Sequence, residues 1–235
     1  MTCTATIARG GHIRENTSIL AGIERRALVW LARRLPRRLH SDHLTMLALT
    51  AMGGAGVSLA AMALTPWAAA GVVVSMALNW FGDSLDGTLA RVRGHERPRY
   101  GYYVDHVVDL AGAILLLAGL ACSTLTAPLT AMFVLAAYLL VSAETYLATH
   151  ARGIFRMSFL GVGPTELRIL FVIGTLRGAY EPFVSLGGLG TVRLFDLGGV
   201  IAAASLIVVF IVSAVRNARA LSAAEPIPSR TAEAA

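Results

Sequence analysis

Charge is scarce in this chain. Of its 235 residues, 14% are charged and 56% are hydrophobic, and the mean hydropathy is +0.66. Because a water-soluble domain has roughly one quarter charged residues, this composition excludes an ordinary soluble domain and favours a protein with several membrane spans. The segments of about ten alternating residues that are typical of a membrane β-barrel are also missing. The first residues contain no apolar core before a small-residue cleavage site, so no cleaved signal peptide is predicted.

Cysteine is scarce in this chain, and lysine is absent. The two cysteines, Cys3 and Cys122, fall at opposite membrane faces in the layout predicted below, so neither a disulfide nor a cysteine metal cluster is expected. All 20 basic residues are arginine. Arginine without lysine, together with abundant alanine, indicates a GC-rich genome and therefore a bacterial plasma membrane.

Long apolar runs are plentiful. A helix of about 20 apolar residues crosses a hydrocarbon core of about 30 Å. Six runs have this length: Leu44 to Leu64, Trp67 to Asp86, Tyr102 to Cys122, Pro128 to His150, Pro164 to Leu186 and Leu194 to Ala214. The prediction is an all-α integral membrane protein with six transmembrane helices. Gly187 to Gly190 marks an outer turn after the fifth of them.

The arginines are distributed unevenly between the two predicted membrane faces. Nearly all lie in residues 9–38, 91–99, 152–168 and 216–230, which share one face in the six-span layout. The exceptions are Arg177 and Arg193. Because basic residues concentrate in cytoplasmic loops, this face and both chain termini are predicted to be cytoplasmic.

Residues 19–40 combine apolar positions at helical spacing with pairs of arginines. The apolar positions are Leu20, Ile23, Ala27, Trp30, Leu31 and Leu35. This pattern predicts an amphipathic helix at the membrane interface, with arginines near anionic lipid headgroups, and Pro36 would kink or end it. Binding of nucleic acid is the less favoured interpretation of the same basic run. The predicted organisation is a cytoplasmic segment (residues 1–40), a six-helix membrane domain (residues 41–215) and a disordered cytoplasmic tail (residues 216–235).

The stretch DSLDGTLARVRGHERPRYGYYVDHVVD, residues 83–109, places four aspartates between apolar runs. On a helix, Asp83, Asp86, Gly87 and Ala90 form one stripe at spacings of three and four residues. A following helix would present Gly101, Asp105 and Asp109 at steps of four. If the two helices form an antiparallel hairpin, the four carboxylates lie at matching depths.

Four ionised carboxylates at the edge of a bilayer repel one another unless cations compensate them. Hard divalent ions with oxygen ligands, Mg²⁺ or Mn²⁺, are the natural partners, and Arg91 adds positive charge for phosphate oxygens. The pattern favours phosphoryl or phosphodiester transfer at a membrane interface. The alternatives are solvated charges at helix ends, a cation transporter and a structural scaffold. Against a transporter, the acids lie near one face, whereas transporter sites lie near the midplane.

These residues carry a family resemblance. Asp83, Asp86, Gly87, Ala90 and Arg91, followed after nine residues by Gly101, Asp105 and Asp109, resemble the defining motif of the class I CDP-alcohol phosphotransferases, also called CDP-alcohol phosphatidyltransferases. The resemblance implies that the four aspartates bind two divalent metal ions that hold the diphosphate of a CDP-alcohol. It also implies that Gly87, Ala90 and Gly101 leave room for the cytidine nucleotide beside Arg91. Asp109 is then a candidate general base, CMP is the leaving group and the enzyme is a homodimer.

Family members often carry Pro-Asn-x-x-Thr at the start of the first span. Here the stretch is Ser41-Asp42-His43-Leu44-Thr45, so only Thr45 is assigned to the nucleotide by resemblance. Ser41 or Asp42 equally fits a simple helix cap.

The family divides between enzymes that use a CDP-aminoalcohol with diacylglycerol and enzymes that use CDP-diacylglycerol with a polar alcohol. His106, beside Asp105, resembles a candidate base of the choline and ethanolamine enzymes, and Glu144, Tyr146 and Glu166 resemble their headgroup residues. These four favour the aminoalcohol branch, although a packed histidine and a helix-start glutamate explain His106 and Glu166 equally well. The cluster Arg152, Arg156 and Arg168 would suit a phosphorylated acceptor such as inositol phosphate or glycerol phosphate, or simply the positive-inside rule. The aminoalcohol branch is the preferred expectation.

Overall fold

The computed structural model describes residues 6–7, 13–15, 21–152, 154–156 and 163–225. Within these residues, α-helices dominate and are joined by short turns and two small β-sheets. The helices are α1 Ala21–Arg34, α2 Ser41–Ala61, α3 Ala68–Arg93, α4 Pro98–Ala121, α5 Pro128–Arg152, α6 Pro164–Tyr180 and α7 Leu194–Ala224. The predicted all-α membrane fold is therefore confirmed.

Five of the described helices, α2, α3, α4, α5 and α7, are long and apolar enough to cross a membrane. The fifth predicted span is shorter than expected. Its helix, α6, has 17 residues and ends at Tyr180, which gives about 26 Å at 1.5 Å per residue. Pro182 explains this end, because proline has no backbone N–H and disfavours helical geometry at the residue before it. After Pro182, β4 (Phe183–Ser185) and β5 (Thr191–Arg193) form a hairpin around the 3₁₀ turn Gly187–Leu189, where the glycine-rich turn was predicted.

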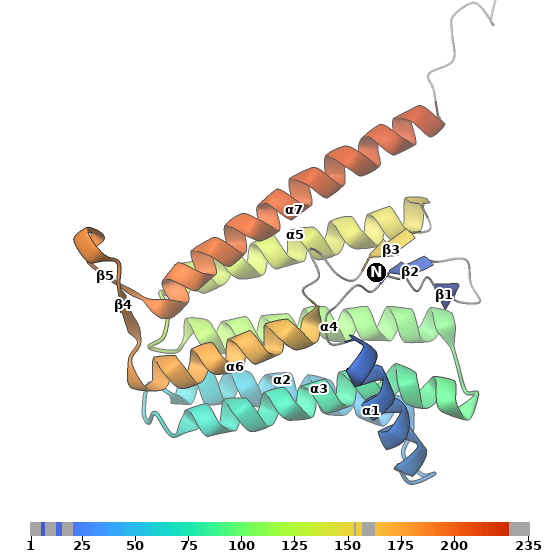
Figure 1. Ribbon diagram of the computed structural model, residues 1–235, viewed down its shortest axis with the longest axis horizontal. Coiled ribbons are helices and arrows are strands. Elements are labelled where there is room, and N and C mark those ends of the chain that lie inside the picture. The colour runs from blue at the N-terminus through green and yellow to red at the C-terminus, as the bar shows by residue number, and fades with distance from the viewer. Residues whose placement is uncertain (1–5, 8–12, 16–20, 153, 157–162, 226–235) are drawn as a thin grey trace, which may run out of the picture.

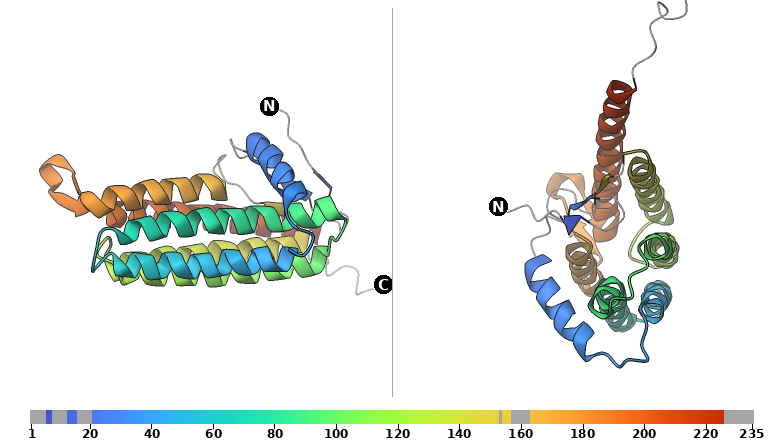
Figure 2. Two further views of the ribbon diagram at one scale, coloured as in Figure 1. Left: turned by 90° about the horizontal axis from the view of Figure 1, so that it is seen from below. Right: turned by 90° about the vertical axis from the view of Figure 1, so that its right-hand side faces the viewer.

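Helices α2 to α7 are arranged in a ring, and α1 lies outside it against α3. Helix α2 packs along both α3 and α4, α5 packs on α4 and α7, and α6 packs on α3 and α7. Figure 2 shows this arrangement end-on in its right-hand view. We call the end of the bundle that carries α1 and the α3–α4 connection the α1 end; it is the right-hand side of Figure 1, and the β4–β5 hairpin lies at the opposite end.

Helices α3 and α4 are consecutive and run in opposite directions, joined at the α1 end (Figure 1). Among the described residues, however, each packs more extensively on α2 than on the other. Small residues of α2 and α4 let these two backbones approach closely. A Cβ atom built on Gly56 would lie 2.3 Å from the carbonyl oxygen of Leu115. The aspartate-bearing faces of α3 and α4 are therefore held in place by α2 rather than by each other.

Helix α1 lies against the α1 end of α3 and is amphipathic, as predicted. Leu28 and Ala32 are buried and pack in one cluster with Leu85 and Leu89 of α3. The helix ends at Arg34, just before Pro36. Of the predicted apolar positions, Leu31 and Leu35 pack against this cluster, whereas Ala27 and Trp30 are exposed. The Arg34 guanidinium lies 3.6 Å from the ring centroid of Trp30.

The last helix is longer than predicted. Helix α7 continues through Ala224, so residues 216–224, which were expected in a disordered tail, are helical. Alanine-rich sequence favours a helix, and the first proline after residue 214 is Pro226. Residues 226–235 lie outside the described residues, as do Cys3 and Leu20, whereas Cys122 is exposed.

A small sheet lies at the α1 end. Strands β1 (Thr6–Ile7) and β2 (Ile13–Glu15) are antiparallel, and β2 pairs in parallel with β3 (Ile154–Arg156). The N-terminal segment is thereby joined to the chain that follows α5 (Figure 1).

Candidate functional site

Asp86 is held in position by the start of α2. The hydroxyl of Thr45 donates to Asp86 Oδ2 at 2.7 Å, and the backbone N–H of Gly87 donates to Oδ1. Ser41 Oγ donates to the backbone carbonyl of Asp86 at 2.9 Å. Because hydrogen bonds to a carboxylate orient its remaining lone pairs, α2 sets the direction in which Asp86 faces a ligand.

This contact depends on a close approach of α2 and α3. A Cβ atom on Gly82 would lie 2.5 Å from the carbonyl oxygen of Leu44 and 2.9 Å from the amide nitrogen of Ala48. Only glycine allows two backbones to come this near. Gly82 thus brings Thr45 within hydrogen-bonding distance of Asp86.

Asp83 is paired with an arginine from a distant part of the chain. Arg168 on α6 forms an ion pair with Asp83 Oδ2, and its Nε donates to Asn79 Oδ1 at 2.8 Å. The amide of Asn79 in turn donates to the carbonyl oxygen of Ala48 on α2 at 3.1 Å. Asn79 was not among the predicted site residues, although it lies four residues before Asp83 and extends the same helical stripe.

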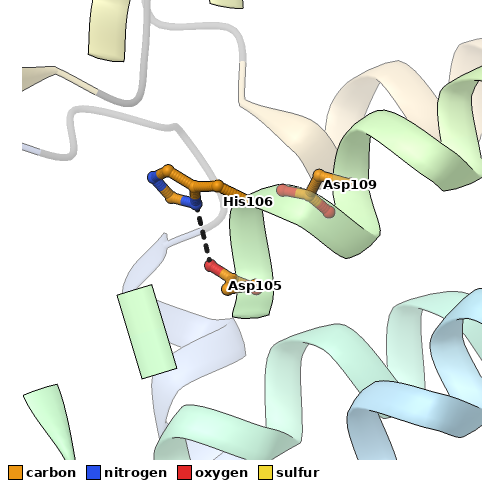
Figure 3. A group of neighbouring side chains, drawn as sticks. All are labelled: Asp105, His106 and Asp109. Atoms are coloured by element: carbon orange, nitrogen blue, oxygen red, sulfur yellow. Dashed lines mark ion pairs between the residues drawn. The ribbon is translucent and has the colours of Figure 1, made fainter. Parts of the chain in front are cut away.

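Asp105, His106 and Asp109 gather on α4 (Figure 3). One ligand atom from each lies within 4.8 Å of the others, and His106 Nδ1 is 3.5 Å from Asp105 Oδ2. Carboxylate oxygens are the ligands that Mg²⁺ and Mn²⁺ prefer, and imidazole is compatible with several divalent ions. This donor set fits a divalent metal ion.

The carboxylates of α3 and α4 face a common region. Asp86 interacts electrostatically with Asp83 and Asp105, and Asp109 interacts with all three and with Arg168. The compact group whose ligand atoms lie within 4.8 Å of one another nevertheless contains only residues of α4. Asp83 instead pairs with Arg168, and Asp86 accepts a hydrogen bond from Thr45. The sequence predicted the convergence of the four acids but not the partners that hold two of them.

The residues assigned to the nucleotide surround the same end of α3. Ala90 lines a cavity of about 440 Å³ between the start of α2 and the α3–α4 connection. Its lining residues are His40, Ser41, Asp42, Leu89, Ala90, Arg93, His95, Glu96 and Arg97. Arg91 donates to Thr88 Oγ1 at 3.0 Å and lies over Gly87. Gly101 is exposed near the start of α4, with open space where a Cβ atom would be.

His106 lies between two tyrosines. Its ring is 4.8 Å from that of Tyr146 at an interplanar angle of 23°, and 4.1 Å from that of Tyr102 at 52°. Its side chain is only 11% exposed. The structure therefore brings two residues assigned to the headgroup branch, His106 and Tyr146, into direct contact.

Glu144 and Glu166, the other two residues assigned to the headgroup, form hydrogen bonds with other parts of the chain. Glu144 accepts hydrogen bonds from Ser213 Oγ at 2.7 Å and Asn217 Nδ2 at 2.6 Å, which joins α5 to α7. Asn217 also accepts a hydrogen bond from Arg152. Glu166 accepts a hydrogen bond from the backbone N–H of Gly163 at 3.1 Å, the arrangement expected of an acid in the first turn of a helix. The side chain of Arg156 lies outside the described residues.

Comparison with known proteins places these observations in a family. The model of the CDP-alcohol phosphatidyltransferase family matches residues 40–211, which include both aspartate pairs. No curated protein sequence matches the chain. Among solved structures, Mycobacterium tuberculosis phosphatidylinositol phosphate synthase with CDP-DAG bound has a similar fold. The TM-score is 0.56 at 20% sequence identity, over 84% of this chain and 94% of that one.

Proposed function

This chain belongs to the CDP-alcohol phosphatidyltransferase family, and we propose that it transfers a phosphatidyl group from CDP-diacylglycerol to a hydroxyl of a polar, phosphate-bearing alcohol, with release of CMP. At the level of the family, it is a multi-pass membrane enzyme that transfers substituted phosphate groups. The observation that carries the proposal is the convergence of four carboxylates from α3 and α4 at one end of the bundle.

In the proposed reaction, the acceptor hydroxyl attacks the phosphorus distal to cytidine. A phosphorus–oxygen bond to the acceptor forms, the bond to the CMP oxygen breaks, and CMP leaves with the electron pair. The acceptor proton passes to the carboxylate of Asp109, which is exposed and interacts electrostatically with the other three acids. An alcohol has a high pKa, so a base near the attacking oxygen lowers the barrier.

Two divalent ions, Mg²⁺ or Mn²⁺, are proposed to be held by Asp83, Asp86, Asp105 and Asp109. The oxygen donors and the compact group on α4 support this assignment. When bound, such ions would neutralise the diphosphate and favour in-line displacement at phosphorus. The roles of the neighbours are then to orient these acids: Thr45 orients Asp86, and Arg168 orients Asp83.

The nucleotide is proposed to occupy the α1 end of α3. The cavity beside Ala90 supports this location, and Thr45, assigned to the nucleotide by resemblance, lies in the neighbouring first turns of α2. Gly87 and Gly101 would leave room for the cytidine nucleotide, and Arg91 would contribute positive charge for its phosphate oxygens.

The CDP-diacylglycerol branch is favoured over the aminoalcohol branch that the sequence analysis preferred. Glu144, the carboxylate expected to hold an ammonium group, is occupied by Ser213 and Asn217 of α7. The similarly folded Mycobacterium tuberculosis enzyme binds CDP-DAG and is named for making phosphatidylinositol phosphate. Arg168, which lies at the acidic site, would add positive charge near the phosphate of an acceptor such as inositol phosphate or glycerol phosphate.

The proposed location is a bacterial plasma membrane, with the site and both termini on the cytoplasmic face and the protein as a homodimer. The arginines of α1 and of the α3–α4 connection, at the end where the aspartates lie, support this orientation.

An assay with different donor substrates distinguishes the CDP-diacylglycerol branch from the aminoalcohol branch. Purified protein in detergent would be given CDP-diacylglycerol, CDP-choline or CDP-ethanolamine, with matched acceptors and Mg²⁺ or Mn²⁺, and CMP would be measured. We expect CMP from CDP-diacylglycerol with inositol phosphate or glycerol phosphate. CMP from CDP-choline or CDP-ethanolamine with diacylglycerol alone would show that the aminoalcohol branch is correct.

A further inference from the structure

Glu24, on the interfacial helix α1, accepts hydrogen bonds from two other helices. Its Oε1 atom lies 2.8 Å from Trp80 Nε1 and 3.4 Å from Ser84 Oγ, both on α3. The same oxygen lies 2.8 Å from Thr165 Oγ1, in the first turn of α6. An acid in the first turn of a helix is ordinarily explained by the helix dipole, which needs no contact with other elements. Three donors from two other helices require a further explanation.

The partners of Glu24 lie next to the residues that hold Asp83. Trp80 follows Asn79 directly and Ser84 follows Asp83 directly, so these side chains leave the same turns of α3 in adjacent directions. Thr165 precedes Arg168 by three residues, which is nearly one turn of α6. Glu24 therefore joins α6 to α3 immediately beside the Arg168–Asp83 ion pair and the Arg168–Asn79 hydrogen bond.

Among the described residues, the first turns of α6 are less buried than the rest of the helix. Leu167, Ile169 and Leu170 are exposed, and the buried residues of α6, Thr175 and Gly178, lie in its other half. Hydrogen bonds to a carboxylate are about twice as strong as hydrogen bonds between neutral groups. Glu24 is thus well placed to determine where the first turns of α6, and with them Arg168, lie relative to α3.

We propose that Glu24 is a positioning residue for the metal site: by holding Thr165 and Trp80 together, it keeps Arg168 in the place where it orients Asp83. This inference rests on the proposed function, because it takes Asp83 to be a metal ligand. Loss of partners behind the ligands of a metal site typically weakens metal binding by roughly 10- to 100-fold. We expect Glu24→Ala to weaken Mn²⁺ binding by roughly tenfold, at the low end of this range because Glu24 acts through Arg168.

The test uses the full-length protein in detergent, with Mn²⁺ binding measured by electron paramagnetic resonance and thermal unfolding measured in parallel. Leu28→Ala is the matched control, since Leu28 joins the same helix, α1, to α3 through apolar contacts alone. It should lower stability without changing the Kd for Mn²⁺. Glu24→Gln, which keeps one acceptor oxygen, should recover part of the affinity. Thr165→Val should reproduce the effect of Glu24→Ala, and the double variant should add little to either.

The outcomes separate this inference from the proposed function. A roughly tenfold weaker Kd in Glu24→Ala and in Thr165→Val, with the Leu28→Ala value unchanged, supports the positioning role. An unchanged Kd in Glu24→Ala, or equal losses in Glu24→Ala and Leu28→Ala, overturns it while leaving the metal site in place. If Glu24→Ala does not fold, Thr165→Val alone decides in the same way. Failure of the unaltered protein to bind Mn²⁺ contradicts the proposed metal site itself.

Discussion

Arg168 on α6 forms an ion pair with Asp83 on α3, 85 residues apart in the sequence. The same guanidinium contacts Asn79, whose amide reaches the backbone of α2 at Ala48. Arg168 therefore joins α6 to α3 directly, and to α2 through Asn79, at the acidic site. Its planar fork, which donates in two directions at once, explains why lysine would be a poor substitute.

Arg168→Lys should retain the charge but lose one of the two contacts. We expect the free energy of unfolding to fall by about 1.5–3 kcal/mol, the range for a hydrogen bond to a charged group, and CMP release to fall with it. Thermal unfolding and a CMP assay would measure the two effects. Unchanged activity would show that Arg168 does not orient Asp83.

Thr45→Val removes the hydroxyl that contacts Asp86 while keeping the shape of the side chain. If Asp86 is a metal ligand, the divalent-ion concentration that gives half-maximal CMP release should rise by roughly 10-fold or more. Thr45→Ser is the control, because serine retains the hydroxyl and should stay close to the unaltered protein. Equal metal requirements in all three proteins would argue against this role for Thr45.

Gly82→Ala should force α2 and α3 apart, since the added methyl group would meet backbone atoms that have no room to move. Overpacking of this kind costs about 1–3 kcal/mol of stability. Gly198→Ala on α7, where a Cβ atom has nothing within 4 Å, is the matched control. There the substitution should stabilise the helix by up to about 1 kcal/mol. Similar melting temperatures for the two variants would mean that the close approach at Gly82 is not needed.

Asp109→Asn and His106→Gln distinguish the two candidate bases. Removal of a general base typically lowers the rate by about 10²- to 10⁴-fold, and we expect a loss of this size for Asp109→Asn. His106 is enclosed by Tyr102 and Tyr146, so His106→Gln should cost less in turnover and more in stability. A larger loss of turnover in His106→Gln would assign the base to the histidine.

The features that helical periodicity determines were predictable. Spacings of three and four residues placed Asp83 and Asp86 on one stripe and Asp105 and Asp109 on another, and apolar positions at helical spacing beside pairs of arginines identified α1. Helix ends followed from proline where it was considered, as at Pro36. The predicted ends were wrong near Pro182, which ends α6 early, and in the alanine-rich sequence that extends α7 to Ala224.

Contacts between helices distant in the sequence were not predictable in this way. Periodicity states which face a residue occupies but not which helix that face meets. Nothing local indicates that Glu144 meets Asn217, that Arg168 meets Asp83, or that α2 rather than α4 packs along α3. For the same reason, the assignment of Glu144 to a substrate ammonium group was reasonable from its motif and is disfavoured by its contacts.

The most direct test of the proposed chemistry compares the unaltered protein with Asp86→Asn, a near-isosteric change, in a CMP-release assay with CDP-diacylglycerol and a phosphorylated polar alcohol. Each protein would be assayed with EDTA and again after Mg²⁺ or Mn²⁺ is restored. We predict that the unaltered protein releases CMP only with divalent metal and acceptor present, that EDTA stops the reaction reversibly, and that Asp86→Asn is inactive under all conditions. Full activity in Asp86→Asn, or CMP release that persists in EDTA, would contradict the account.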